Sequence, residues 1–275
     1  MYSLNCKGRL FSWHEPIVMG ILNLTPDSFY TGSRIRSEEM LLRQAEKMVG
    51  EGAAILDFGG LSSRPGALEI SEDAEIDRVC PAIQLIASRF PASLISVDSY
   101  RYNVAKAALD AGASIINDIG AGEHENLALL AAVENIPYIC MHMRGNPRTM
   151  QNLTDYEDII TEVLDFFISR KAEYTRLGVN DLIIDPGFGF AKTTAQNFLL
   201  LKKMKMLEML DLPVMVGLSR KATVYKTLDI KPEDALNGTT VLHTLALEQG
   251  ARILRVHDVK EASETIRLWT SYANA

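Results

Sequence analysis

The sequence predicts an α/β protein whose single domain, residues 1–275, is a (β/α)8 TIM barrel. Three observations predict this fold class. The length of 275 residues suits one barrel, short apolar runs alternate with longer amphipathic stretches, and eight such runs are present. An open doubly wound sheet has the same local pattern. Eight evenly distributed units without a break in composition favour the closed barrel.

The predicted strands are short, β-branched and apolar on both faces, which is typical of buried parallel strands. In chain order they are Ile17–Leu22, Ala53–Phe58, Leu94–Val97, Ser114–Ile116, Ile136–Met141, Leu182–Ile184, Pro213–Gly217 and Arg252–Val256. Residues 1–16 precede the first strand. We expect them to form a short hairpin that plugs the bottom of the barrel.

Helical patterns lie between the strands. The longest predicted helix is Asp155–Leu177, which Gly178 ends. The first helix ends at Gly50 and Gly52, just before the second strand. Its apolar residues fall on one helical face, at i, i+4, i+7 and i+8: Leu41, Ala45, Met48 and Val49.

The composition is that of an ordinary globular protein, with 47% hydrophobic and 23% charged residues. A net charge of −7 argues against nucleic acid as the main partner, because phosphate backbones require a basic surface. The three cysteines are odd in number and have no zinc or redox spacing. No apolar run is long enough to span a membrane. We therefore expect a cytoplasmic, soluble protein.

Polar residues follow every predicted strand, at the end of the barrel where active sites of this fold lie. They are amides, carboxylates and cations. In chain order they are Asn23, Asp57, Asp98, Asn117 with Asp118, His142, Asp185, Ser219-Arg220-Lys221, and His257-Asp258, with Arg255 inside the last strand.

Three of the carboxylates, Asp57, Asp98 and Asp185, follow runs that should be wholly buried. A buried carboxylate needs a partner, so a ligand or cation should lie nearby. We favour a functional role for Asp98 and Asp185. For Asp57, a functional role and a structural role are equally favoured. Asp118 and Asp258 fit the alternative of a turn residue or helix N-cap.

The last two strands and the residues just after them carry four cations: Arg220, Lys221, Arg255 and His257. A surface salt bridge is the alternative for each of them. Their convergence at one rim favours an anion site, which this fold often builds from its seventh and eighth loops. The oxygen of Asn23 is a hard ligand suited to Mg²⁺ held mainly by phosphates and water, with a turn residue as the alternative.

Eight motifs, one for each strand, resemble those of the dihydropteroate synthase family. They run in order from about residue 17 to 258. The motifs are GILNLTPDSF (20–29), DFGGLSSRPG (57–66), SVDS (96–99), ND (117–118), MHMRGNPRTMQ (141–151), DPGFGFAK (185–192), GLSRK (217–221) and RVHD (255–258).

The resemblance implies an enzyme that transfers an alkyl group other than methyl. It would condense 7,8-dihydropterin-6-ylmethyl pyrophosphate with p-aminobenzoate to give 7,8-dihydropteroate and pyrophosphate in folate biosynthesis. The displacement would be loose and carbocation-like, with Mg²⁺ as cofactor. The resemblance also implies a homodimer through late helices and a target for sulfonamides.

Matching positions imply the roles of individual residues. The catalytic residues would be Asp98, Asp185, Lys221 and Arg255. The pterin would be bound by Asp98, Asn117, Asp185, Lys221 and Arg255. Pyrophosphate would be bound by Asn23, Ser63, Arg64, Arg255 and His257, and Mg²⁺ by Asn23. The p-aminobenzoate site would be bordered by Phe29, Ser63, Arg64, Pro65, Phe190, Ser219 and Lys221.

Two other functions share the barrel and its carboxylates. A pterin-dependent methyltransferase has no need for the loop with Arg64 or for an anion site at Arg255 and His257. A non-catalytic pterin-binding barrel should have lost Asn23, Arg64 or Lys221, and the sequence retains all three.

Overall fold

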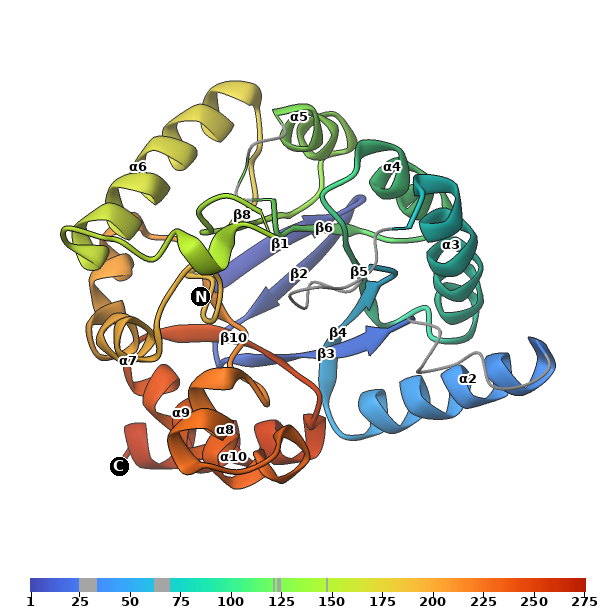
Figure 1. The fold of residues 1–275 in the computed structure, drawn as a ribbon. Helices are drawn as coiled ribbons and strands as arrows, with labels where there is room; N and C mark the ends of the chain where they lie inside the picture. Colours follow the sequence, from blue (N-terminus) through green and yellow to red (C-terminus); the bar gives the residue numbers. More distant parts are fainter. Residues whose placement is uncertain (25–33, 62–69, 121, 123–124, 147) are drawn as a thin grey trace.

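The computed structural model describes the chain except residues 25–33, 62–69, 121, 123–124 and 147. Eight parallel strands close into a barrel, in the order β10-β3-β4-β5-β6-β7-β8-β9 (Figure 1). The predicted fold class is therefore confirmed. The barrel strands are β3 (Ile17–Asn23), β4 (Ala53–Gly59), β5 (Leu94–Asp98), β6 (Ile115–Asp118), β7 (Tyr138–Met141), β8 (Leu182–Asp185), β9 (Val214–Val216) and β10 (Ala251–Val256).

Helices surround the barrel on its outside (Figure 1). They are α2 (Arg34–Gly50), α3 (Glu72–Arg89), α4 (Tyr102–Ala111), α5 (Glu125–Glu134), α6 (Ile159–Leu177), α7 (Thr194–Lys203), α8 (Ala222–Leu228), α9 (Leu236–Glu248) and α10 (Val259–Ala273). Short 3-10 helices follow at η1 (Met150–Asn152), η2 (Met204–Leu210) and η3 (Pro232–Asp234). The outward faces of the strands pack against these helices in one large apolar cluster.

The strand ends differ from the predicted ends in a way that matters for the site. Several polar residues expected just after the strands are instead their last residues, including Asn23, Asp98 and Asp185. Hydrogen bonding within the barrel continues to these positions, because Asp98 is in register with Asn117 and Asp185 with Met141. The backbone of a barrel strand therefore fixes where each of these side chains begins.

The inward-facing residues form layers, since alternate residues of a strand face opposite sides. The lowest layer is wholly apolar, and it lies beneath a layer rich in polar side chains. The apolar cluster consists of Met19, Ile55, Leu94, Ile115, Ile139, Ile183, Met215 and Ile253, together with Leu4, Cys6 and Trp13 of the N-terminal segment.

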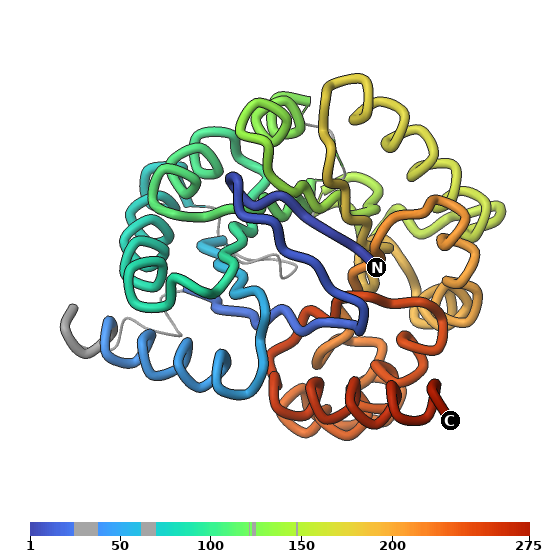
Figure 2. Tube along the Cα trace, turned by 180° about the vertical axis from the view of Figure 1, so that it is seen from behind, coloured from blue at the N-terminus to red at the C-terminus, as the bar shows by residue number. Residues whose placement is uncertain are grey.

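This N-terminal segment is an antiparallel hairpin of β1 (Tyr2–Cys6) and β2 (Arg9–Trp13), as predicted. Seen from behind, it crosses the centre of the barrel (Figure 2). The Asn5 backbone N–H donates to Asp181 Oδ2 at 2.7 Å, and the Arg9 guanidinium donates to the carbonyls of Pro91 and Ala92. The hairpin thus covers the end of the barrel where the strands begin.

The longest of the described helices is α6, but it begins at Ile159 instead of the expected Asp155. The Asp158 side chain caps it by accepting from the Ile160 N–H. The Glu162 carboxylate accepts from the backbone N–H groups of Glu157 and Asp158, which folds the preceding residues back over the first turn. These local bonds end the helical pattern four residues early.

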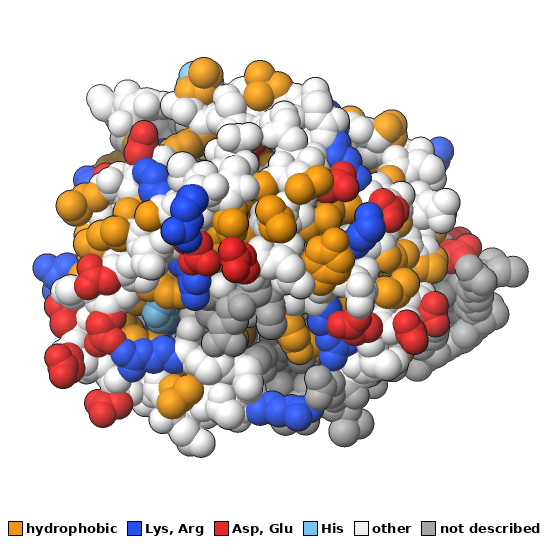
Figure 3. Space-filling view, turned by 90° about the horizontal axis from the view of Figure 1, so that it is seen from above, with side chains coloured by type: hydrophobic (Ala, Val, Ile, Leu, Met, Phe, Trp, Pro, Cys, Tyr) orange, Lys and Arg blue, Asp and Glu red, His pale blue; other side chains and the backbone are white. Residues whose placement is uncertain are grey.

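Among the described residues, no helix has the length and apolar character needed to cross a membrane. The face shown in Figure 3 carries scattered apolar side chains between charges of both signs, and acidic side chains gather toward its left edge.

Candidate active site

The candidate site is the polar layer at the end of the barrel where the strands finish. Arg255 of β10 crosses this layer to two carboxylates. Its Nε donates to Asp57 Oδ2 at 2.7 Å, and its Nη2 donates to Asp98 Oδ2 at 2.5 Å. Burial lowers and the two carboxylates raise the pKa of Arg255, and the net shift is upward. The guanidinium therefore stays charged and holds β10 to β4 and β5.

Asp57 is completely buried, and both of its neighbours in the site were expected to be functional. Besides the bond from Arg255, its two oxygens lie 3.5 and 3.3 Å from Asn117 Nδ2. Asp57 thus orients two candidate pterin-binding residues, Arg255 and Asn117. The sequence favoured a functional and a structural role for Asp57 equally. The bond from Arg255, which indicates a role in the site, joins residues 198 positions apart. Only closure of the barrel brings them together.

Three buried side-chain oxygens of β5 and β6 have no hydrogen-bond partner among the described residues: the Ser96 hydroxyl, Asp98 Oδ1 and Asn117 Oδ1. The last two, a carboxylate and an amide oxygen, can only accept hydrogen bonds. A buried acceptor without a donor costs about 1–3 kcal/mol. Because they lie on neighbouring strands in register, they form a pair of acceptors for a ligand that carries N–H groups.

Burial, with the nearby charges of Asp57 and Glu75 and against the charge of Arg255, raises the pKa of Asp98 to about 7. Asp185 Oδ1 accepts from the Gly187 N–H at 2.8 Å. Burial also raises the pKa of Asp185, against the charge of Lys221. Burial thus disfavours the charged form of both carboxyl groups, and a cation or N–H group bound beside them would favour it again.

Lys221 lies on the opposite wall of the layer. Its Nζ donates to the Phe188 carbonyl at 2.5 Å and lies 4.4 Å from the centre of the Phe190 ring. Burial lowers the pKa of Lys221 to about 8, although Asp185 opposes the decrease. Lys221 and Phe190, both expected at the p-aminobenzoate site, are therefore adjacent.

The loop between Asp185 and Lys192 is held from inside by a buried lysine, Lys192. Its Nζ lies 2.9 Å from His142 Nδ1 and donates to the carbonyls of His142, Gly187 and Phe190 at 3.0–3.3 Å. Gly187 has φ +68°, and a Cβ there would lie 1.9 Å from the His142 carbonyl oxygen. Only glycine fits this position. His142, which the sequence left undecided, therefore supports the loop.

Ser219 and His257 join the ends of β9 and β10. The Ser219 Oγ lies 3.1 Å from His257 Nδ1 and accepts from the His257 backbone N–H at 3.2 Å. The neighbouring residues form a second link, in which the Arg220 guanidinium binds Asp258 through two bonds of 2.8 Å. The salt-bridge alternative therefore holds for Arg220, whose guanidinium pairs with Asp258.

The two carboxylates assigned to turns or caps behave differently from each other. Asp118 accepts from the Tyr138 hydroxyl at 2.5 Å and from the Gly120 N–H at 2.7 Å, so the turn interpretation is confirmed. Asp258 occupies the N-cap position of α10, but its side chain makes no capping bond and binds Arg220 instead.

Asn23 ends β3 at the mouth of the barrel and is half-buried. A Cβ at Gly59 would lie 3.5 Å from both Asn23 Oδ1 and Asp98 Oδ2, so these two oxygens flank one glycine. Four of the expected site residues lie outside the described residues: Phe29, Ser63, Arg64 and Pro65.

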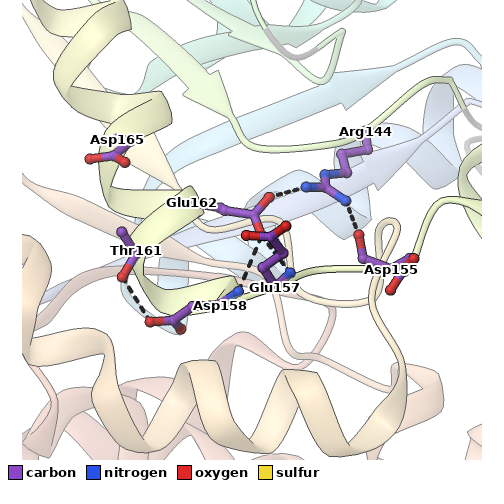
Figure 4. Close-up of a pocket in the computed structure, with 7 residues that line it drawn as sticks. All are labelled: Arg144, Asp155, Glu157, Asp158, Thr161, Glu162 and Asp165. Carbon is purple, nitrogen blue, oxygen red and sulfur yellow. Dashed lines mark hydrogen bonds and ion pairs between the residues drawn. The ribbon is translucent and has the colours of Figure 1, made fainter.

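A separate hollow of about 600 Å³ lies beside the start of α6, away from this layer (Figure 4). Its lining is mostly acidic, but its polar groups bind one another. The Arg144 guanidinium pairs with Glu162 and donates to the Asp155 carbonyl, and the Asp158 carboxylate accepts from the Thr161 hydroxyl. We interpret this hollow as the capping structure of α6.

Comparisons with known proteins find one family over nearly the whole chain. The model of the family described as pterin binding enzyme matches residues 19–257. The dihydropteroate synthase of Escherichia coli strain K12 is 40% identical over 267 residues, covering 96% of this chain and 94% of the relative. Yersinia pestis dihydropteroate synthase, solved with a sulfonamide drug complex, has a TM-score of 0.92 at 37% identity, with both chains fully covered. The Xanthomonas albilineans enzyme, solved with 4-aminobenzoic acid, has a TM-score of 0.91 at 36% identity and covers 99% of this chain and 98% of that one.

The barrel, its polar layer and the matched family together define a pterin-binding enzyme. Within that class, the identity over nearly the whole length of both chains is decisive. The chain belongs to the dihydropteroate synthase family.

Proposed function

We propose that the chain condenses 7,8-dihydropterin-6-ylmethyl pyrophosphate with p-aminobenzoate, giving 7,8-dihydropteroate and pyrophosphate in folate biosynthesis. The observation that carries this proposal is the pair of buried acceptors, Asp98 Oδ1 and Asn117 Oδ1, which have no partner among the described residues. The amino and ring N–H groups of a pterin supply donors of the kind that this pair lacks.

The pterin would lie between these acceptors and the opposite wall. Asp185 has one oxygen held by the Gly187 N–H, so its other oxygen is available to a ring N–H. Lys221 would donate to the oxo and ring-nitrogen edge, and Arg255 would cover the ring face. The fixed position of Arg255, bound to Asp57 and Asp98, supports this role.

Pyrophosphate would lie at the rim, contacted by Asn23, Arg255 and His257 together with Ser63 and Arg64. We also propose that Mg²⁺ accompanies it. The oxygen of Asn23 suits this ion, and no described side chain binds the Asn23 amide. The described residues contain no group of three or more potential His, Cys, Asp or Glu ligands. This donor set fits an ion held mainly by phosphate oxygens and water, which would neutralise the leaving group.

The p-aminobenzoate ring would enter beside Phe190, Ser219 and Lys221, with Phe29, Ser63, Arg64 and Pro65 completing the site. The arylamine is neutral at pH 7 and needs no strong base. Catalysis would therefore rest on stabilising the charge that develops as pyrophosphate leaves. Asp98 and Asp185 would stabilise a cationic ring methylene.

Pyrophosphate release from the dihydropterin substrate tests this function. We expect release with Mg²⁺ and p-aminobenzoate, and its loss in excess chelator. Lys221→Ala should lower substrate binding about 10- to 150-fold, the value of a charge-assisted hydrogen bond of about 1.5–3 kcal/mol. Asp185→Asn should be at least as harmful, because it replaces an acceptor with a donor. Wild-type turnover in both variants would contradict the pterin site.

A homodimer through the late helices is part of this proposal. Exposed apolar side chains on α9 and α10 support it, with Val241, Leu245, Leu268 and Tyr272 each about half exposed or more. We also propose a cytoplasmic location, which agrees with the three free cysteines, Cys6, Cys80 and Cys140. Sedimentation of the purified protein, and of a Leu268→Glu variant, tests the dimer.

A further inference from the structure

The link between Ser219 and His257 has a consequence for the proton on the His257 ring. Ser219 follows β9 and is almost fully buried, whereas His257 follows β10 and its side chain is exposed. The adjacent ion pair of Arg220 with Asp258 fastens the same two loops together. The geometry at Ser219 is therefore held by a second connection only one residue away.

A serine hydroxyl has one hydrogen to donate and two lone pairs. One lone pair of Ser219 Oγ accepts from the His257 backbone N–H at 3.2 Å. The remaining contact is with His257 Nδ1, at 3.1 Å. Either the hydroxyl donates to Nδ1, or an N–H at Nδ1 donates to the hydroxyl.

The second arrangement leaves the hydroxyl hydrogen of Ser219 without an acceptor among the described residues. Since Ser219 is buried, water does not readily replace that acceptor, and an unsatisfied buried donor is unfavourable. The first arrangement satisfies both partners. It requires that Nδ1 carries no hydrogen.

We propose that Ser219 is a positioning residue that fixes His257 as the neutral tautomer with its hydrogen on Nε2. This inference rests on the proposed function. An Nε2–H is a donor suited to the oxygens of pyrophosphate, whereas the other tautomer would present a lone pair to the same anion. Ser219 thus acts through His257, on the side of the ring away from the ligand.

The tautomer can be measured directly in protein labelled with ¹⁵N-histidine. A two-bond ¹H–¹⁵N correlation spectrum separates a ring nitrogen that carries hydrogen from one that does not. The chain has five histidines, and a His257→Gln variant identifies which signals belong to His257. We expect an unprotonated Nδ1 and a protonated Nε2 in the wild type. Ser219→Ala should lose this preference, and Ser219→Thr, which keeps the hydroxyl, should restore it.

Pyrophosphate binding gives a second measurement, by calorimetric titration with inorganic pyrophosphate and Mg²⁺. Ser219→Ala should weaken binding about 10-fold, the value of one hydrogen bond, and Ser219→Thr should recover it. In a His257→Gln background, Ser219→Ala should have little further effect, because the two residues act as one unit. As a control, Ser263→Ala removes a hydroxyl that binds the Glu51 carbonyl far from these loops, and it should change neither result.

Three results would overturn the inference: a hydrogen on Nδ1 in the wild type, an unchanged spectrum in Ser219→Ala, or an equal loss of affinity in the His257→Gln background. None of these would affect the proposed function, which fails only if the dihydropterin substrate releases no pyrophosphate. The spectrum requires no turnover, so it reports the His257 tautomer even in a protein without activity.

Discussion

Arg255 binds two carboxylates, and the consequences of removing either one differ from those of a surface ion pair. Asp57 is fully buried and accepts from both Arg255 and Asn117. When Asp57 is removed, Asp98 still pairs with Arg255, but the Arg255 Nε–H and the Asn117 amide lose their buried acceptor, at a cost of about 1–3 kcal/mol for each group. We therefore expect Asp57→Ala to lower the free energy of unfolding by about 2–6 kcal/mol.

Urea denaturation measures this loss, and Asp77→Ala provides the matched control. Asp77 is an exposed aspartate of α3, where substitutions change stability by about 0.5 kcal/mol or less. If both variants were equally stable, the network around Arg255 would have no structural role.

Lys221 should make pterin binding depend on pH. Burial lowers the pKa of Lys221 to about 8, so the ammonium group is present below that pH and is lost above it. The neutral amine is a weaker donor. We expect the affinity for a dihydropterin without its pyrophosphate to fall as the pH rises from 7 to 9.

This probe avoids the titration of phosphate, and Lys221→Arg supplies the control. A guanidinium keeps its charge over the whole range, so that variant should show no alkaline decrease in affinity, even if it binds more weakly. The same alkaline decrease in Lys221→Arg would assign the titration to another group.

For single residues, the sequence correctly predicted positions that depend only on the residue's own strand. Asp98, Asn117 and Asp185 were expected at strand ends and lie there. The partners of Arg255 and the turn of Arg220 toward Asp258 were not predicted, because they join residues distant in the sequence. The local pattern around Arg220 is the same whether it faces an anion or a carboxylate.

Among the elements, the loop between β8 and α7 depends most on one side chain. Lys192 holds three carbonyl groups and His142 Nδ1, and the same loop presents Phe188 and Phe190 to Lys221. Lys192→Met would leave several buried acceptors without a donor, at about 1–3 kcal/mol for each. We expect it to lower both stability and affinity for the pterin.

The loss of stability should also depend on pH. Burial lowers the pKa of Lys192 to about 7, from an ordinary value of 10.5. Between these values the unfolded protein binds more protons than the folded protein, so the stability of the wild type rises with pH. The difference between wild type and Lys192→Met should therefore be larger at pH 9 than at pH 6.5.

Denaturation curves at the two pH values measure this difference, and Lys202→Met, at an exposed position of α7, is the control. A constant difference would mean that Lys192 keeps its ordinary pKa in the folded protein.

The presence of helices and strands was predictable from hydrophobic period and composition, whereas the residues at which they begin and end were less predictable. The face formed by Leu41, Ala45 and Met48 is buried, as its spacing indicated. The start of α6 was missed by four residues, since Glu162 folds the chain back on Glu157 and Asp158. A capping bond of this kind depends on side-chain geometry and not on hydrophobic period.

At the scale of the whole molecule, the hairpin and the polar layer occupy opposite ends of the barrel. Leu4 is buried in the apolar cluster with Ile55 and Ile253. Leu4→Ala should lower the free energy of unfolding by about 2–5 kcal/mol, the range for a large buried side chain. It should leave the KM for both substrates unchanged.

Leu10 of the same hairpin is 71% exposed and makes the matched control. We expect Leu10→Ala to change neither stability nor KM. A raised KM in Leu4→Ala would mean that the two ends of the barrel are coupled.

The barrel itself was the feature that the sequence predicted best, because eight short apolar runs alternate with helical patterns along the whole chain. Closure follows from the pairing of β10 with β3, which places Arg255 beside Met19. The hairpin was expected from its position before the first strand, but its hydrogen bonds to Asp181, Pro91 and Ala92 were not, since they depend on how the finished barrel presents its lower loops.

The separation of the apolar lower layer from the polar upper layer also bears on how such a protein evolves. Residues such as Ile139 and Met215 belong to the apolar cluster and can exchange for others of similar volume at a small cost. A lineage adapting to a hotter or colder habitat can therefore change the lower layer while its chemistry stays constant. Gly187 and Asp57 have no such freedom, so inherited variation should collect at one end of the molecule and be purged from the other.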